Sequence, residues 1–373
     1  MTTYCISDCI YIIDKKYLNF ELKKHNYINE TLRNYSHKIK KEIDNNIKEW
    51  EKNKKYSNPY EFINTNFDSN TEPVCKYKPL SRSFFKLIEI LNSFTFLNFN
   101  KHKINSFHLA EGPGGFIEAL SYFRNNPNDI YYGITLIENK KHIPKWKSYD
   151  NYLTIHKNIK FEYGVDKTGN LLNKQNLLYI YKLYHNSIDF VTGDGGFDFS
   201  DDFNKQEEIS LNLIFSQILY AICIQKKGGH FVLKLFDTFT CLSLDLLYLL
   251  NYLYEDVYFI KPHTSRPGNS EKYIVCKNFL MLDNTKFIIN YLIENFHYIV
   301  QNKVTRIFNF TIPQYFKDKI EEINSIFGQT QIEHIQSVLI YILDSNKKVN
   351  LENLKKSHFI KCTKWCKKNN LPY

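Results

Sequence analysis

The sequence predicts an α/β fold, built on a mostly parallel β-sheet with helices on both faces. Between about residues 76 and 282, apolar runs typical of strands alternate with longer runs typical of helices. Strands that alternate with helices of this length form parallel sheets that are buried on both sides. The chain of 373 residues is 43% hydrophobic and 16% aromatic, so it can bury a core of the size that such a sheet needs.

The expected elements follow one another through three zones. Residues 1–75 are predicted to form a charged, helical N-terminal extension, in which residues 36–55 are typical of an exposed helix. Residues 76–282 are expected to form the α/β domain, and residues 283–373 a helical extension with a basic end. Within the domain we expect strands at 107–110, 130–137, 188–194, 230–237, 256–262 and 272–278, and helices at 116–126, 174–186, 207–227 and 243–255.

The composition narrows the classes of partner and compartment. A formal net charge of +10 and a pI of about 8.9 fit an anionic partner such as nucleic acid, although a basic balance can also serve solubility alone. The eight cysteines are expected to be reduced thiols in an intracellular protein. We expect no membrane span, because no apolar run approaches ~18 residues free of charge. The abundance of Lys, Asn, Ile and Tyr, which AT-rich codons encode, suggests the genome of a large DNA virus or a protist.

A glycine-rich turn lies in the stretch "SFHLAEGPGGFIEAL", residues 106–120, between a strand-like and a helix-like run. Glycines at such a crossing let backbone N–H groups approach a ligand, and the helix start adds a positive dipole end. A nucleotide-like ligand is one interpretation. The other is a tight turn with Gly112 and Gly115 at positive φ and no ligand.

Four charged residues stand where an open α/β sheet places its ligands, beyond the carboxyl ends of the strands. Asp194 ends one strand, Lys234 lies inside another, and Glu271 begins a third. Lys86 lies on an amphipathic helix expected over residues 79–91. A lysine inside a strand loses hydration, and its pKa falls unless a carboxylate compensates. A buried Lys234–Asp194 ion pair without chemistry is the alternative interpretation.

The order and local context of these four residues resemble the Lys-Asp-Lys-Glu tetrad of FtsJ-type ribose 2′-O-methyltransferases. The segments "GPGGF", "GITL", "DGGF", "GGHFVLKLFDTFT" and "FIKPHTSRPGNSEKYIVCK" are most similar to cap-specific mRNA 2′-O-methyltransferases that modify the first transcribed nucleotide. The resemblance covers roughly residues 78–280. It implies a Rossmann-like sheet, S-adenosylmethionine as cofactor and capped mRNA as partner. It also allows association with other capping or transcription factors, in the cytoplasm, for example in a viral factory, or in the nucleus.

The resemblance also implies which residues bind the cofactor and the RNA. The implied cofactor-binding residues are Glu111, Gly112, Pro113, Gly114, Gly115, Phe116, Thr135, Leu136, Asn170 and Asp194. The candidate RNA-binding residues are Arg82, Arg266, Asn269 and Ser270, and the two arginines could instead hold the local fold. The sequence departs from the family at His108 and Asn170, where relatives carry Asp; Asp166 lies close to the second position.

The implied catalytic residues are Lys86, Asp194, Lys234 and Glu271. Methyl transfer to a ribose hydroxyl needs aligned reactants and removal of one proton. Lys234 is the candidate base, with a pKa lowered by burial and by the Lys86 cation, while the carboxylates orient the lysines. The reaction requires no metal. Two C-x3-C pairs, Cys5 with Cys9 and Cys362 with Cys366, are more typical of a helix face than of a zinc site.

Two other functions stay open at the level of sequence. One is ribose methylation of ribosomal or transfer RNA, and the other is a catalytically silent RNA-binding subunit that has kept the fold. The intact tetrad favours an enzyme. A NAD-dependent dehydrogenase is disfavoured, because the turn reads "EGPGG" rather than G-x-G-x-x-G.

Overall fold

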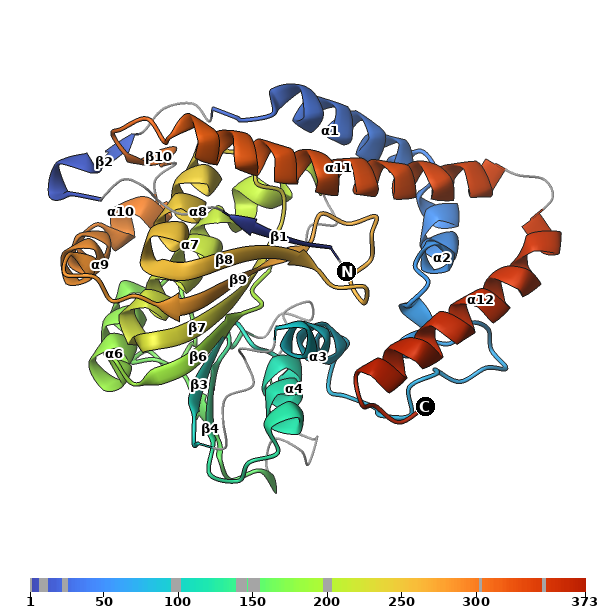
Figure 1. The fold of residues 1–373 in the computed structure, drawn as a ribbon, viewed down its shortest axis with the longest axis horizontal. Helices are drawn as coiled ribbons and strands as arrows, with labels where there is room; N and C mark the ends of the chain where they lie inside the picture. Colours follow the sequence, from blue (N-terminus) through green and yellow to red (C-terminus); the bar gives the residue numbers. More distant parts are fainter. Residues whose placement is uncertain are drawn as a thin grey trace.

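The protein is built on one eight-stranded sheet with the strand order β1-β8-β9-β7-β6-β3-β4-β5 (Figure 1). The computed structural model describes residues 2–6, 13–21, 26–94, 102–138, 146, 155–196, 203–301, 304–343 and 347–373. The strands are β1 (Thr2–Ile6), β2 (Leu18–Glu21), β3 (Asn105–Leu109), β4 (Ile130–Ile134), β5 (Ile159–Glu162), β6 (Ile188–Gly193), β7 (Gln225–Leu235), β8 (Tyr254–Lys261), β9 (Lys272–Phe279) and β10 (Arg306–Phe308).

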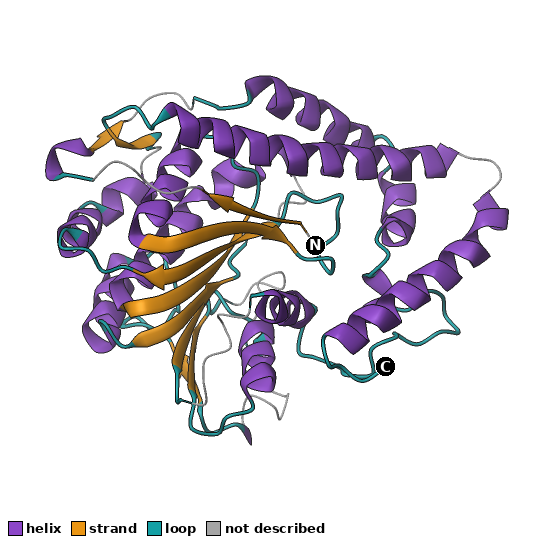
Figure 2. Ribbon diagram, viewed as in Figure 1, coloured by secondary structure: helices purple, strands orange, loops and turns teal. Residues whose placement is uncertain are grey.

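Helices cover both faces of this sheet (Figure 2). They are α1 (Glu30–Asp44), α2 (Ile47–Ser57), α3 (Ser83–Ser93), α4 (Gly115–Arg124), α6 (Lys174–Tyr184), α7 (Gln206–Ile224), α8 (Cys241–Leu253), α9 (Thr285–Glu294), α10 (Phe296–Gln301), α11 (Gln314–Leu343) and α12 (Lys347–Lys368). The predicted α/β fold, with helical segments at both ends of the chain, is confirmed.

Five neighbouring strands, from β7 to β5, pair in parallel, whereas β9, β8 and β1 run antiparallel to their neighbours. Because the parallel strands share a direction, their carboxyl ends meet at one edge of the sheet. The antiparallel β9 enters that same edge with its first residues, since Leu235 at the end of β7 pairs with Lys272 at the start of β9. This register brings the residue before β9 beside the end of β7.

The sheet separates two hydrophobic cores. Along β7, Phe231 and Leu233 pack in the core that α7 and α8 cover. Val232 points the other way and packs with side chains of α3 and α4 in a second core, which we call the α3 core. Side chains two residues apart on a strand share a face, so this alternation fixes the orientation of every later residue of β7.

Several elements differ from the sequence prediction. β1 and the β2–β10 pair lie in zones predicted to be helical only, and β5 was not predicted. These strands have only three to five residues, too few for a period-2 pattern to stand out. The helix predicted over residues 36–55 is two helices, because Asn45 and Asn46 interrupt it between α1 and α2.

The terminal helices pack against the sheet and against each other. Trp50 of α2 lies in a small cluster with Ile335 and Val338 of α11, the long helix that Figure 1 shows beside α1. Trp365 of α12 packs in the α3 core, with its ring centroid 6.0 Å from that of Phe85. Trp365 near the C-terminus therefore helps to position α3.

Helix α7 is the one helix in the described ranges that is long and apolar enough to cross a membrane. Its 18-residue apolar window has a mean hydropathy of 1.3, but 78% of that window is buried inside the protein. Figure 1 shows α7 lying against the sheet, so its apolar character serves the core.

Candidate active site

Strand alternation turns three of the predicted catalytic residues toward the same face of the sheet. Val232 lies in the α3 core, and Lys234 follows it by two residues on β7. Phe190 also lies in the α3 core, and Asp194 follows it by four residues at the end of β6. Glu271 directly precedes β9 and forms an ion pair on this same face. The side chains therefore point to the face that α3 covers.

Helix α3 brings the fourth residue, Lys86, to this face. The Lys86 Nζ lies 2.7 Å from Glu271 Oε1, and the Lys234 Nζ lies 3.2 Å from Asp194 Oδ1. All four side chains are between 11% and 18% exposed, so they are largely desolvated yet open to a substrate. The structure thus brings together the four residues that the sequence pointed to, as two neighbouring ion pairs.

Asp194 holds Lys234 through two oxygen atoms. The Lys234 Nζ donates to the Asp194 backbone carbonyl at 2.6 Å as well as facing its carboxylate. The Tyr273 hydroxyl donates to Asp194 Oδ1 at 3.1 Å and thereby fixes the carboxylate. Gly196 lies beside the amine, since a Cβ there would lie 3.3 Å from Lys234 Nζ. The amine is therefore oriented by Asp194 and borders a residue without a side chain.

Among the four residues of the cluster, Glu271 has the clearest shift in pKa. Burial alone would raise the pKa of this carboxyl, but the ammonium groups of Lys86 and Lys234 outweigh burial and lower it to about 2. The Ser265 hydroxyl also donates to Glu271 Oε1 at 2.8 Å. Glu271 is therefore an ionised carboxylate at neutral pH, and it interacts with both lysines.

The glycine-rich turn lies next to this cluster and is organised from within by Glu111. Its carboxylate accepts hydrogen bonds from the backbone N–H groups of Phe116 at 2.7 Å and Ile117 at 2.9 Å, at the start of α4. Burial and the nearby Asp194 raise the pKa of Glu111. Because a carboxylate already occupies these N–H groups, the helix start does not offer them to a phosphate. The turn suits a cofactor without phosphate groups.

Gly114 is the glycine of this turn that adopts a left-handed conformation, with φ of 116°. The interpretation that placed Gly112 and Gly115 at positive φ is wrong. Gly115 is needed for a different reason, because a Cβ there would collide with the hydroxyls of Ser81 and Ser83 just before and at the start of α3. Gly115 therefore lets the turn pack against the helix that carries Lys86.

The end of β4 and the loop before α6 complete the surroundings of the turn. The Gly112 N–H donates to Thr135 Oγ1 at 3.1 Å, and Leu136 follows half-buried. Gly169, with φ of 65°, packs directly against the Thr135 carbonyl. Asn170 comes next, and its Oδ1 accepts from the Leu172 N–H at 2.9 Å. The structure thus places Asn170 near the turn, with its side-chain oxygen engaged in a local turn.

His108, the other departure from the family, is a buried neutral side chain. Its Nδ1 lies 2.8 Å from Thr192 Oγ1 and its Nε2 lies 2.9 Å from Ser106 Oγ. Burial lowers the pKa of His108 to about 3. Two neighbouring hydroxyls therefore satisfy the imidazole inside the sheet.

The two arginines predicted to contact RNA both bind Glu61, a residue that the sequence did not single out. Arg82 lies 3.2 Å and Arg266 lies 2.5 Å from Glu61 Oε1. Burial would raise the pKa of Glu61, but the two guanidinium groups lower it. Glu61 is 1% exposed, whereas the side chains of Arg82 and Arg266 are 30% and 34% exposed. The arginines hold the local fold, and their contact with RNA stays a prediction.

Removing the Glu61 carboxylate is expected to destabilise the protein. Glu61→Ala leaves two partly buried guanidinium groups without their shared acceptor, at a cost of about 2 kcal/mol or more in the free energy of unfolding. Glu51→Ala, which removes an exposed pair with Lys54 on α2, should change it by less than about 1 kcal/mol. Urea unfolding compares the two variants, and equal midpoints would contradict the structural importance of Glu61.

The C-terminal cysteines lie in the α3 core rather than at a surface site. Cys362 and Cys366 of α12 are buried, and Cys366 interacts with the Cys75 thiol. Cys9 of the N-terminal pair lies outside the described residues. Within the described ranges, no group of three or more His, Cys, Asp or Glu side chains could hold a metal ion.

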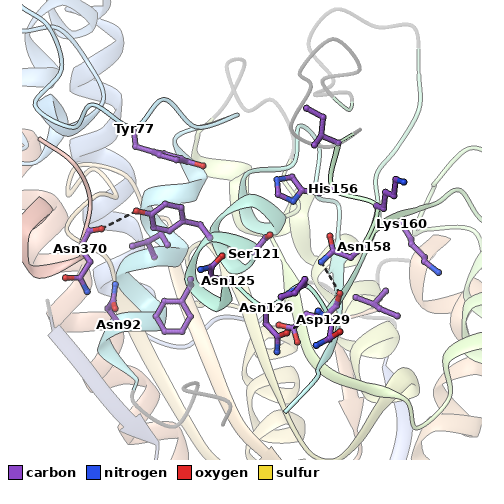
Figure 3. A pocket seen from close by; sticks show the side chains of 18 of the residues that line it. Tyr77, Asn92, Ser121, Asn125, Asn126, Asp129, His156, Asn158, Lys160 and Asn370 are labelled. Carbon is purple, nitrogen blue, oxygen red and sulfur yellow. Dashed lines mark hydrogen bonds between the residues drawn. The ribbon is translucent and has the colours of Figure 1, made fainter. Parts of the chain in front are cut away.

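Figure 3 shows an open groove of about 1210 Å³. It lies where β4 and β5 begin, at the edge of the sheet opposite the charged cluster. It is lined by Asn125 at the end of α4, by Ile130 at the start of β4, and by Asn158 and Lys160 near β5. None of the four tetrad residues lines it. The groove and the charged cluster are therefore separate features of the molecule.

The fold and the cluster together define a Rossmann-like methyltransferase with a Lys-Asp-Lys-Glu site. The chain belongs to the FtsJ-like methyltransferase family, which matches residues 79–279. S-adenosylmethionine is the methyl donor of this family, and the turn described above fits it. The predicted cofactor-binding residues of the Glu111–Phe116 turn lie beside Thr135 and the loop that carries Asn170, and their contact with the cofactor stays a prediction.

Several curated relatives are named as cap methyltransferases. The chain is 28% identical to cap-specific mRNA (nucleoside-2'-O-)-methyltransferase 2 of Danio rerio, over 87% of this chain and 45% of that protein. It is 44% identical to methyltransferase 1 of Trypanosoma cruzi, over 32% of this chain and 33% of the relative. It is 32% identical to the inactive cap-specific mRNA (nucleoside-2'-O-)-methyltransferase 1B of Caenorhabditis briggsae, over 52% of this chain and 23% of the relative. The chain thus spans less than half the length of each of these relatives.

Proposed function

We propose that the protein is an S-adenosylmethionine-dependent mRNA cap 2′-O-methyltransferase that methylates the ribose of the first transcribed nucleotide. The observation that supports this most strongly is the pairing of Lys86 with Glu271 and of Lys234 with Asp194, beside the turn that Glu111 organises. Two lysines and two carboxylates are costly to desolvate, and clusters of this kind gather at functional sites.

The arrangement of Lys234 explains how it would act as the general base. A neutral amine has two N–H bonds and one lone pair. Both hydrogens can be directed at Asp194, to its carbonyl at 2.6 Å and its carboxylate at 3.2 Å. The lone pair is then left for the proton of the ribose 2′-hydroxyl. S-adenosylmethionine, when bound, supplies a methyl carbon that positive sulfur makes electrophilic.

The other members of the cluster orient the proposed base and compensate the positive charges. Glu271, ionised at neutral pH, pairs with Lys86 and also lowers the electrostatic cost of protonating Lys234. Tyr273 holds the Asp194 carboxylate through its hydroxyl.

Capped mRNA is the acceptor in this proposal, because the relatives named above are cap-specific mRNA methyltransferases. The net charge of +10 suits a polyanionic substrate. We place the reaction inside the cell, in the cytoplasm or nucleus, where it could be associated with other capping or transcription factors.

A catalytically silent RNA-binding subunit is the alternative, and one similar relative is named as inactive. The present chain has both lysines and both carboxylates in paired positions, which supports activity. Ribosomal or transfer RNA is the alternative acceptor.

Short RNAs that differ only in their 5′ end are expected to separate these functions. With labelled S-adenosylmethionine, RNA with a methylated guanosine cap should be methylated at least about 10-fold better than the same RNA with a 5′-triphosphate, a preference of ~1.4 kcal/mol. The label should map to the first transcribed nucleotide. Equal use of uncapped ribosomal or transfer RNA fragments would support the alternative acceptor, and no transfer at all would support the silent subunit.

A further inference from the structure

Lys261, the last residue of β8, makes an unusually complete set of hydrogen bonds. Its Nζ donates to the Asn269 carbonyl at 2.6 Å, to Asn269 Oδ1 at 3.0 Å and to the Glu271 carbonyl at 2.6 Å. An ammonium group has three N–H bonds, and all three are matched here by oxygen acceptors. The side chain therefore spans the loop of residues 262–270, which connects β8 to β9.

This loop delivers Glu271 to the catalytic cluster. At its start, the buried Glu89 of α3 accepts from the N–H groups of His263 at 2.8 Å and Thr264 at 3.2 Å. At its end, Lys261 holds both the residue that precedes Ser270 and the backbone of Glu271 itself. Glu89 and Lys86 lie one turn apart on α3, so the loop is fixed to the same helix that carries the partner of Glu271.

Lys261 faces away from the space beside Lys234. It lines a cavity of about 10 Å³, too small for more than a water molecule, together with Asp237, Lys272 and Gln331. The Ser270 hydroxyl next to it is turned inward and donates to Gln206 Oε1 at 2.5 Å. A group in this position can hold the loop but cannot reach the substrate.

We propose that Lys261 is a positioning residue for methyl transfer: it closes the β8–β9 loop and fixes the Glu271 backbone, so that the Glu271 carboxylate keeps Lys86 in place. This inference rests on the proposed function and extends it to a residue outside the tetrad. Without the ammonium group, the Glu271 carbonyl loses its hydrogen bond to Lys261. The 2.7 Å pair with Lys86 is then held from the loop side by the Ser265 hydroxyl and by the pairing of β9 with its neighbouring strands.

The charged state of Lys261 sets the conditions of the test. Burial, together with the cations of Lys272 and Lys86, outweighs the opposing carboxylates of Glu271 and Asp237 and lowers the pKa of Lys261 to about 7. His334 of α11 also faces this lysine. Because the folded-state pKa lies below the ordinary value, the ammonium form prevails only below about pH 7. The variants are therefore compared with the wild type at about pH 6, where Lys261 is an ammonium group that makes all three hydrogen bonds.

A double-mutant cycle tests whether Lys261 acts through Glu271. Lys261→Met should lower kcat about 10-fold, with the affinity for S-adenosylmethionine unchanged. The kcat of the double variant Lys261→Met, Glu271→Gln should lie within about twofold of that of Glu271→Gln alone. Once the Glu271 carboxylate is gone, Lys261 has nothing left to position. Lys277→Met on β9, which removes a partly exposed ion pair with Asp256 of β8, is the matched control and should keep wild-type kcat.

Hydrogen exchange gives a readout that does not depend on activity. The amides of residues 263–266 and 268–271 should exchange at least about 10-fold faster in Lys261→Met than in Lys277→Met, while those of residues 114–117 stay unchanged. Unchanged exchange in the loop, wild-type kcat, or a double variant that shows the product of both losses would each overturn the proposal. If the wild-type chain methylates no RNA, the proposed function fails, and exchange alone decides whether Lys261 holds the loop.

Discussion

Lys234→Met is expected to lower turnover at least about 100-fold while the affinities for S-adenosylmethionine and RNA stay within a few-fold of wild type. Methionine keeps the bulk of the side chain but removes the amine that Asp194 orients through its carbonyl and its carboxylate. Single-turnover methylation assays, with affinities measured separately, give the comparison.

Two further variants make this result specific. Lys234→Arg should not restore turnover, because a guanidinium group stays protonated and cannot accept the hydroxyl proton. Lys226→Met changes a lysine at the other end of β7, whose side chain is 46% exposed beside Asp189, and it should leave turnover unchanged. Substantial turnover in folded Lys234→Met would mean that alignment of the reactants carries the catalysis.

Gly114→Arg is expected to abolish binding of S-adenosylmethionine. Gly114 has φ of 116° and is buried at the start of α4, so any larger side chain strains the backbone and fills the turn. Isothermal titration calorimetry on the folded variant should show no cofactor binding at concentrations that saturate the wild type.

Gly228→Arg is the matched control for backbone strain. Gly228 also has a left-handed conformation, with φ of 80°, but nothing lies within 4 Å of an added Cβ. This variant should bind the cofactor as the wild type does. Unaltered affinity in folded Gly114→Arg would show that the turn does not bind the cofactor.

The parallel sheet and the four charged residues could be predicted because their signals are local. A period-2 pattern in "GGHFVLKLFD" sets the face of Lys234 relative to Val232, and Asp194 directly follows the apolar strand β6. The carboxyl edge of a parallel sheet then brings such residues together. The pairing of Lys86 with Glu271 needed the resemblance as well, because a single lysine on an amphipathic helix is usually solvated.

Glu61 and Lys261 could not be predicted from local patterns. Glu61 binds Arg266, 205 residues away in the chain, and the polar and aromatic segment around it has no pattern that marks a buried carboxylate. Lys261 is followed by Pro262 and reads as an ordinary strand end, although its side chain closes the loop to Glu271. Long-range polar contacts of this kind leave no period in the sequence.

The role of Asn170 also depended on information that the sequence lacks. Position 170 lies beside the turn, as the resemblance implied, through the contact of Gly169 with the Thr135 carbonyl. Its side-chain oxygen accepts from the Leu172 N–H, a local turn that Asn commonly makes. Cofactor binding by Asn170 stays a prediction.

Removing one hydroxyl from the substrate tests the central claim most directly. Two capped RNAs are compared, one with a 2′-deoxyribose at the first transcribed nucleotide and one with it at the second. If the Lys234 amine takes the proton from the first 2′-hydroxyl, methyl transfer from labelled S-adenosylmethionine should vanish for the first RNA and persist for the second. Persistent labelling of the first RNA would contradict the account, because the methyl group would then be going to a different atom.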